Sequence, residues 1–170
     1  MKTFSFLILL SAFSLRSYKD VRYQLPLEEA AAFIHNPPST LNKTLLLQLV
    51  NKVRQTGCKC GNTYYYPAPP LSWNNKLESA AYNHSLDMFQ HKYFSHVAPD
   101  GSKGGARIDA AGYHWMAYAE NIGMGYTKEK EVVDAWIKSP EHCKNIMNKT
   151  YKEMGAAKVG NYWTQDFGVK

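Results

Sequence analysis

The sequence lacks an apolar run long enough to cross a bilayer. Its longest uncharged apolar stretch is FSFLILLSAF at residues 4–13, well short of the ~20 residues that a transmembrane helix needs. Lys2 precedes this stretch and small residues follow it, which is the pattern of a secretory signal peptide. We therefore expect residues 1–17 to be a signal peptide, with an uncleaved anchor as the alternative. The mature chain is expected to be secreted, periplasmic or on the cell surface, without a stable membrane span.

The sequence also lacks a cluster of basic residues. Residues 1–17 contain two basic residues and no acidic one, so the formal charge falls from +6 to +4 when they are removed. The remaining lysines are scattered, and Lys128 and Lys130 alternate with Glu129 and Glu131. Because nucleic-acid binding usually needs a clustered basic face, we expect no nucleic-acid partner.

Cysteine is scarce, with three residues in the chain. In an exported protein this number indicates one disulfide and one free thiol. A bridge between Cys58 and Cys60 would be strained, so one of the two is expected to pair with Cys143. A zinc site made of these cysteines and His142 is the alternative, although C-x-C and an adjacent His-Cys depart from the usual ligand spacing.

Several signatures of known catalytic and repeat proteins are missing. The sequence contains no G-x-S-x-G, which argues against a serine hydrolase of that type, and no H-E-x-x-H, which argues against the corresponding zinc proteases. It has no internal repeat and no low-complexity segment. Hydrophobic residues make up 45% and aromatic residues 14%, which suits one folded domain with a substantial core.

The order of apolar patterns predicts an α+β fold. Residues 18–39 read as a linker that includes one short helix at 27–35, and the domain is expected to span residues 40–170. Its first helix should begin at a cap, Ser39 or Thr40, and end before Gly57. Lys52, Arg54 and Gln55 are expected to project away from the apolar stripe of this helix. Further helices are predicted at 75–90, 106–111, 127–138 and from residue 139, strands at 119–125, 155–159 and 162–167, and an extended surface connection at 63–72.

Two imidazoles and a carboxylate stand out as a candidate site: His96, Glu120 and His142. If Ser139 caps its helix, His142 lies in the first turn, where the positive helix end favours a neutral ring that can bind a metal or accept a proton. Glu120 begins a predicted strand and could orient one imidazole. A hydrogen-bonded polar cluster without turnover is the structural alternative. His84 lies on an apolar helix face and is expected to be buried and hydrogen-bonded.

An ordered series of motifs resembles the CAP superfamily, also called the SCP domain, in its bacterial form. The motifs are Tyr93-Phe94-Ser95-His96, Pro99-Asp100-Gly101, Arg107, Ala111-Gly112-Tyr113, Ala119-Glu120-Asn121-Ile122, Trp136, Ser139-Pro140-Glu141-His142, Met154-Gly155-Ala156 and Tyr162 to Gly168. The resemblance implies a three-layer α-β-α sandwich, an extracellular protein and a disulfide from Cys60 to Cys143. It also implies a cleft with two His and two Glu, in which some members bind zinc or another divalent ion.

The resemblance places His96, Glu120 and His142 in that cleft, with His96 and His142 as metal ligands. The second Glu would fall near Ser139 and is missing, while Glu141 replaces the usual Gly before the second His. The leading interpretation is a binding module for an extracellular or cell-envelope ligand, with a lipid or a divalent cation as candidates. The alternatives are a metal-assisted hydrolase that uses His96, Glu120 and His142, and a non-catalytic structural envelope protein.

Overall fold

A four-stranded sheet forms the middle layer of the protein. The structure, a computed structural model, describes residues 37–170, so the expected signal peptide and the short helix at 27–35 lie outside the described residues. The strand order is β3 (Ser72–Trp73), β5 (Glu153–Val159), β6 (Tyr162–Val169) and β4 (Ala117–Met124). β3 runs parallel to β5 and the other pairs are antiparallel. β4 is therefore an edge strand.

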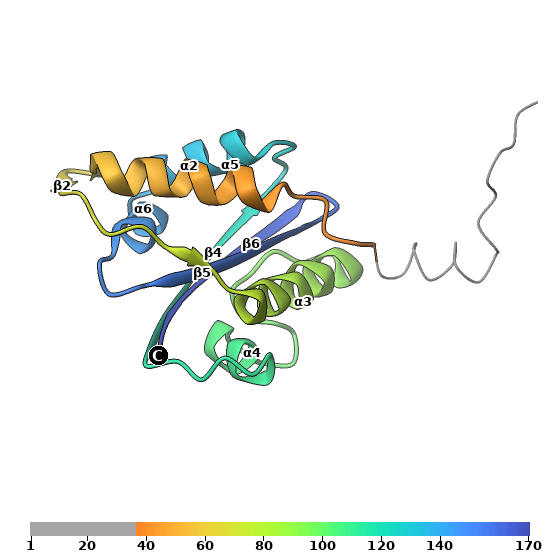
Figure 1. Ribbon diagram of the computed structural model, residues 1–170. Helices are drawn as coiled ribbons and strands as arrows, with labels where there is room; N and C mark the ends of the chain where they lie inside the picture. Colours follow the sequence, from red (N-terminus) through yellow and green to blue (C-terminus); the bar gives the residue numbers. More distant parts are fainter. Residues whose placement is uncertain (1–36) are drawn as a thin grey trace, which may run out of the picture.

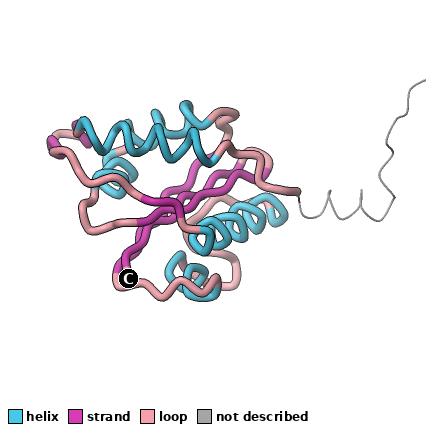
Figure 2. Tube along the Cα trace, viewed as in Figure 1, coloured by secondary structure: helices cyan, strands magenta, loops and turns pink. Residues whose placement is uncertain are grey.

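Helices cover both faces of this sheet (Figure 1, Figure 2). On one side lie α2 (Lys43–Thr56), α5 (Glu129–Lys138) and α6 (Pro140–Met147), and on the other lie α3 (Asn75–His91) and α4 (Gly104–Ala110). The larger core cluster joins the first set of helices to the sheet through fully buried side chains such as Leu46, Trp136 and Trp163. The predicted α+β class and the α-β-α sandwich are confirmed.

The packing of α3 on the sheet depends on a glycine. A Cβ on Gly155 of β5 would lie 2.0 Å from the backbone nitrogen of Glu78 in α3. No side chain fits there, because real Cβ contacts do not approach so closely. The helix that carries His84 is therefore held against the backbone of β5 and β6.

Two helix starts differ from the sequence-based expectation. α2 is capped by Asn42, whose Oδ1 accepts from Leu45 N at 3.0 Å, rather than by Ser39 or Thr40. Ser39 Oγ instead accepts from Lys158 N at 3.1 Å, so the segment before α2 is tied to β5. α5 begins at Glu129 with Lys128 in the cap position. The expected cap, Thr127, lies one residue earlier and donates to Glu131 Oε2.

Arg54 was expected to project from the apolar stripe of α2, and this prediction is wrong. Its side chain is fully buried and donates to the backbone oxygens of Pro69, Ile146, Asn148 and Tyr151. The guanidinium thus satisfies carbonyl groups of three segments that converge beside the end of α2.

A small antiparallel hairpin lies outside the main sheet. It consists of β1 (Cys58–Cys60) and β2 (Thr63–Tyr65), so the first residues of the predicted extended connection form a short strand. The expected disulfide joins Cys60 to Cys143, and Cys58 is a free thiol. Because two of the three sulfurs are bonded to each other, the cysteines do not offer a three-thiolate zinc site in this state.

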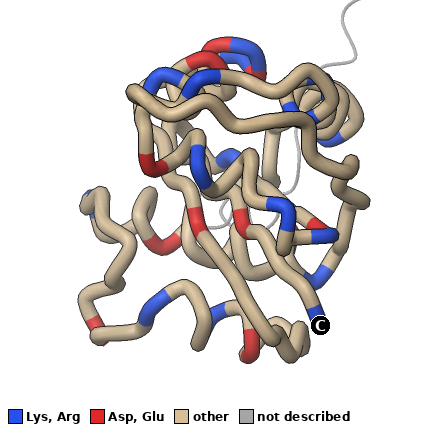
Figure 3. The backbone as a smooth tube through the Cα atoms, turned by 90° about the vertical axis from the view of Figure 1, so that its left-hand side faces the viewer, with Lys and Arg blue, Asp and Glu red and all other residues tan. Residues whose placement is uncertain are grey.

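The charges of the described residues are mixed over the surface. In Figure 3, short segments bearing Lys or Arg alternate with segments bearing Asp or Glu. Among residues 37–170, no helix is long and apolar enough to cross a membrane.

Candidate functional site

A hydrogen bond between His96 and Glu120 lies at the centre of the candidate site. Glu120 stands in the edge strand β4, and His96 stands in the loop between α3 and α4. Nδ1 of His96 is 2.8 Å from Oε1 of Glu120. Because a carboxylate only accepts, Nδ1 carries the proton, and Nε2 of the neutral ring keeps its lone pair. This bond therefore fixes the tautomer that a metal ligand or a base requires.

The carboxylate of Glu120 is almost completely buried and is held on its other side by Arg107 of α4. Arg107 donates to Oε2 of Glu120 at 2.7 Å, to the carbonyl oxygen of His96 at 3.0 Å and to that of Ser102 at 2.9 Å. Burial alone would raise the pKa of Glu120. The hydrogen bond from His96 and the charge of Arg107 outweigh this effect and lower the pKa below its ordinary value. Glu120 is therefore an anion at neutral pH.

His142 approaches the same region from α6. It is the third residue of a helix that starts at Pro140, and its ring centroid lies 6.4 Å from that of His96. Partial burial lowers the pKa of His142, a proton on His96 would lower it further, and the charge of Glu141 opposes both effects. The neutral form expected from the helix position is thus favoured mainly by desolvation.

Two adjoining cavities follow the exposed edge of β4. One, of about 520 Å³, is lined by His96, Glu120, Tyr118, Lys103 and Asn145 among others. The other, of about 290 Å³, is lined by His142 with Phe94, Tyr126 and Trp136. We call these two cavities together the cleft. One of its halves is polar and the other is largely aromatic.

Two buried groups lie behind Glu120. His84 of α3 is fully buried, as expected, and its Nε2 donates to the carbonyl oxygen of Ser95 at 3.0 Å. Its Nε2 is also 3.8 Å from Oε1 of Glu120, so the residue supports the candidate site as well as the core. Burial lowers the pKa of His84 and keeps the ring neutral. Asp166 of β6 lies opposite Glu120 in the strand register and is also buried.

The position of the missing carboxylate is not filled by a neighbour. Ser139 lines the aromatic half of the cleft and brings no charge. Glu141 is exposed and forms an ion pair with Lys144 at 2.6 Å, so it does not enter the cleft in place of the missing Glu. Sequence reasoning also assigned no role to Arg107. Arg107 does stand in the series of family motifs, which pointed to a role. Its contacts with His96 and Glu120, however, depend on how the loop before α4 folds.

The two imidazoles can accommodate a metal ion, but they supply only two protein ligands. A tetrahedral ion bonded to both rings at ~2.0–2.1 Å would bring their centroids to about 5 Å, roughly 1 Å closer than they are. Glu120 uses both oxygens for His96 and Arg107, so it acts as the partner that orients a ligand rather than as a ligand. Within residues 37–170, the three cysteines are the group of three His, Cys, Asp or Glu side chains whose ligand atoms lie close enough together to hold one metal ion.

Comparison with known proteins identifies the class to which this fold and cleft belong. The model of the family described as "CAP: Cysteine-rich secretory protein family" matches residues 47–167. This chain belongs to that family, and the resemblance seen in its motifs is confirmed.

Individual relatives are bacterial. YkwD of Bacillus subtilis, an uncharacterized protein, is 34% identical over 100 residues, which are 58% of this chain and 39% of YkwD. YlbC of the same organism, an uncharacterized membrane protein, is 30% identical over 97 residues, or 57% of this chain and 28% of YlbC. An extracellular protein from Bacillus anthracis with an SCP domain has a TM-score of 0.66 and 26% identity, over 75% of this chain and 40% of that one. The chain thus spans less than half the length of these relatives.

Proposed function

We propose that this protein is an exported binding module whose cleft holds a divalent cation, zinc above all, between His96 and His142. The bound cation would face an extracellular or cell-envelope ligand. The observation that carries the proposal is the bond from His96 Nδ1 to the buried carboxylate of Glu120. This bond reserves Nε2 for a metal and matches the carboxylate–histidine–metal arrangement of known zinc sites.

Two further features support a binding role. The family and the extracellular relative from B. anthracis agree with the signal-like segment at residues 1–17. The cleft combines a polar half with an aromatic half, a composition suited to a ligand with one charged or polar end and one apolar end. A bound cation would supply positive charge that attracts a carboxylate or phosphate group of such a ligand.

The absence of a second cleft carboxylate limits the affinity. With Ser139 where the family pattern has Glu, two imidazoles and solvent would complete the coordination. Zinc binding is therefore expected to be weaker than in a four-ligand structural site.

Calorimetric titration with zinc chloride tests this proposal. His96→Ala and His142→Ala should each lower zinc affinity at least about tenfold, since each removes one of two protein ligands. The matched control is His114→Ala, because His114 is 88% exposed and pairs with Asp109 outside the cleft. Equal affinity in the wild type and both cleft variants would show that this pair does not hold the ion.

A further inference from the structure

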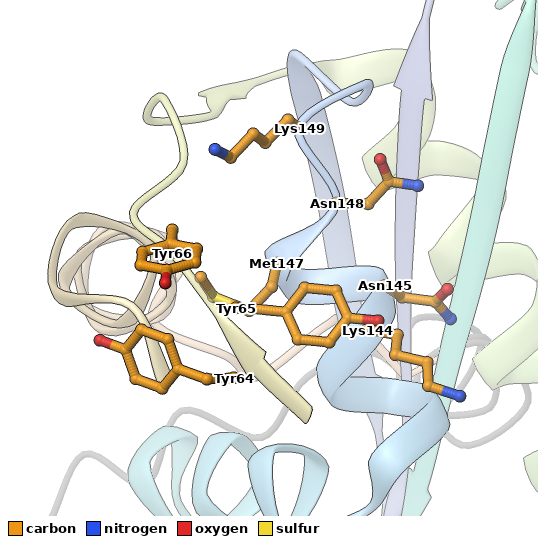
Figure 4. Close-up of a pocket in the computed structure, with 8 residues that line it drawn as sticks. All are labelled: Tyr64, Tyr65, Tyr66, Lys144, Asn145, Met147, Asn148 and Lys149. Carbon is orange, nitrogen blue, oxygen red and sulfur yellow. The ribbon is translucent and has the colours of Figure 1, made fainter. Parts of the chain in front are cut away.

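A second cavity lies on the hairpin side of α6. It has a volume of about 490 Å³, within the range of ligand pockets. The hairpin side contributes Tyr64, Tyr65 and Tyr66, and the end of α6 and the segment after it contribute Lys144, Asn145, Met147, Asn148 and Lys149 (Figure 4). The ring of Tyr65 points toward α6, whereas that of Tyr64 points away from it. We call this cavity the tyrosine groove. It is distinct from the cleft but adjoins it, because Asn145 lines both.

The aromatic wall is exposed. Tyr64 is 53% and Tyr66 is 72% exposed, and their rings meet edge to face with centroids 5.3 Å apart. This contact supports the two rings against each other, and both side chains remain largely exposed. The face of an aromatic ring is electron-rich, so it attracts the weakly positive C–H groups on the flat side of a sugar ring.

The opposite wall is positively charged. The groove is lined by Lys144 and Lys149 and by no acidic residue. Lys144 is paired with Glu141 at 2.6 Å, whereas Lys149 forms no ion pair or hydrogen bond through its ammonium group with another described residue. Lys149 is therefore the group available to an incoming anion.

The groove is also held rigidly. The disulfide Cys60–Cys143 fixes the hairpin to α6. The buried Arg54 binds the carbonyl oxygens of Pro69, in the segment after the tyrosines, and of Asn148, which itself lines the groove. A site organised in advance loses little conformational entropy when it binds.

From these features we infer that the tyrosine groove binds an acidic polysaccharide, a chain of sugar rings that bear carboxylates. The tyrosine faces would stack on the rings, and Lys149 would pair with a carboxylate. A chain is favoured over a single small molecule because the groove continues into the cleft at Asn145. An acidic peptide lacks the flat rings, and a nucleic acid would need a longer basic track than two lysines.

Calorimetry of the mature protein with an oligogalacturonate of defined length tests this inference. The wild type should bind this probe more tightly than it binds a neutral cello-oligosaccharide of the same length. Tyr66→Ala should weaken binding about tenfold, whereas Tyr66→Phe, which keeps the ring, should retain most of it. Lys149→Gln should weaken binding and reduce its salt dependence. The control Lys138→Gln makes the same charge change on the exposed end of α5 and should have no effect.

The outcomes separate this inference from its competitors. No binding of the oligogalacturonate, or equal binding by Tyr66→Ala, overturns it. Equal or tighter binding of poly-glutamate would identify a surface for acidic peptides, and tighter binding of oligo-dT would identify one for single-stranded nucleic acid. Either result also rejects the inference. The sugar titrations are run with EDTA and without added zinc, so failure of the zinc proposal and failure of this one are distinguishable.

Discussion

Glu120 and Asp166 are neighbouring buried carboxyl groups whose pKa values are shifted in opposite directions. They face each other in the register of β4 and β6, and Asp166 is 1% exposed. Glu120 has hydrogen bonds from His96 and Arg107, whereas Oδ1 of Asp166 has no partner among the described residues. Burial and then the charge of Glu120 raise the pKa of Asp166, and Arg107 opposes them only in part. The cluster thus pairs a carboxyl group of lowered pKa with one of raised pKa.

The raised pKa of Asp166 makes stability depend on pH. In the unfolded chain this carboxyl loses its proton near pH ~3.9, but in the folded protein it keeps it to higher pH. Between these two pKa values the folded state binds more protons, so its stability falls as pH rises. Asp166→Asn removes this titration, so its free energy of unfolding relative to the wild type should rise between pH 4 and pH 8. Urea unfolding from pH 4 to pH 8 measures this difference.

The control for this prediction is Asp134→Asn. Asp134 is half exposed and pairs with Lys130 at the surface, so its removal should change stability little. If the wild type and Asp166→Asn lose stability in parallel between pH 4 and pH 8, then folding does not raise the pKa of Asp166.

The site residues show which part of this arrangement the sequence can predict. His96, Glu120 and His142 follow from the motif series, since each stands in a short recognisable pattern. The positions of His84 and Asp166 behind Glu120 do not, because they depend on the packing of α3 on β6. The motif Thr164-Gln165-Asp166-Phe167 marks a strand, but only the strand register shows that Asp166 is opposite Glu120.

At the scale of elements, the long helices and strands were predictable and the short ones were not. α3 was expected at 75–90 and spans Asn75–His91, because its apolar face repeats over several turns. β3 has two residues and pairs with β5, which lies some eighty residues later in the chain, so no local sequence pattern predicts it. Ser39 and Thr40 were the expected caps of α2, but Ser39 pairs with Lys158 of β5 and Asn42 takes the cap position.

The disulfide between β1 and α6 allows a prediction at this scale. It joins residues 83 positions apart, and its loss in Cys143→Ser should lower the free energy of unfolding by about 2–4 kcal/mol. Cys60→Ser should cost less, because Cys58 Sγ is 3.6 Å from Cys143 Sγ and can form the bond instead. Urea unfolding gives the stabilities, and peptide mapping under non-reducing conditions identifies the bonded pair.

Cys58→Ser provides the matched control, because it removes the free thiol and keeps the native bond. It should unfold like the wild type. A Cys60→Ser protein with Cys58 still reduced and the stability of Cys143→Ser would show that Cys58 does not substitute for Cys60.

At the scale of the whole molecule, Arg54 connects parts of the chain that are far apart in sequence. From α2 it reaches the carbonyl oxygens of Pro69, before β3, and of Ile146 and Asn148, at the end of α6. Burial lowers its pKa to about 10, so it still carries its charge at neutral pH. Among residues 37–170 no carboxylate pairs with it, and backbone carbonyl dipoles compensate the buried charge.

Replacing Arg54 should therefore destabilise the protein globally. Arg54→Met keeps much of the apolar stem but leaves several buried carbonyl groups without a donor, and should cost on the order of 3–5 kcal/mol in urea unfolding. Arg54→Lys keeps the charge but has a single ammonium group, which cannot reach both Pro69 and Ile146 as the planar fork does, so its loss should be intermediate. The control Lys52→Met alters an exposed cation two residues earlier on α2 and should change stability little. Equal stability of Arg54→Met and the wild type would mean that these carbonyls find other partners, and Arg54 would then not be what joins the three segments.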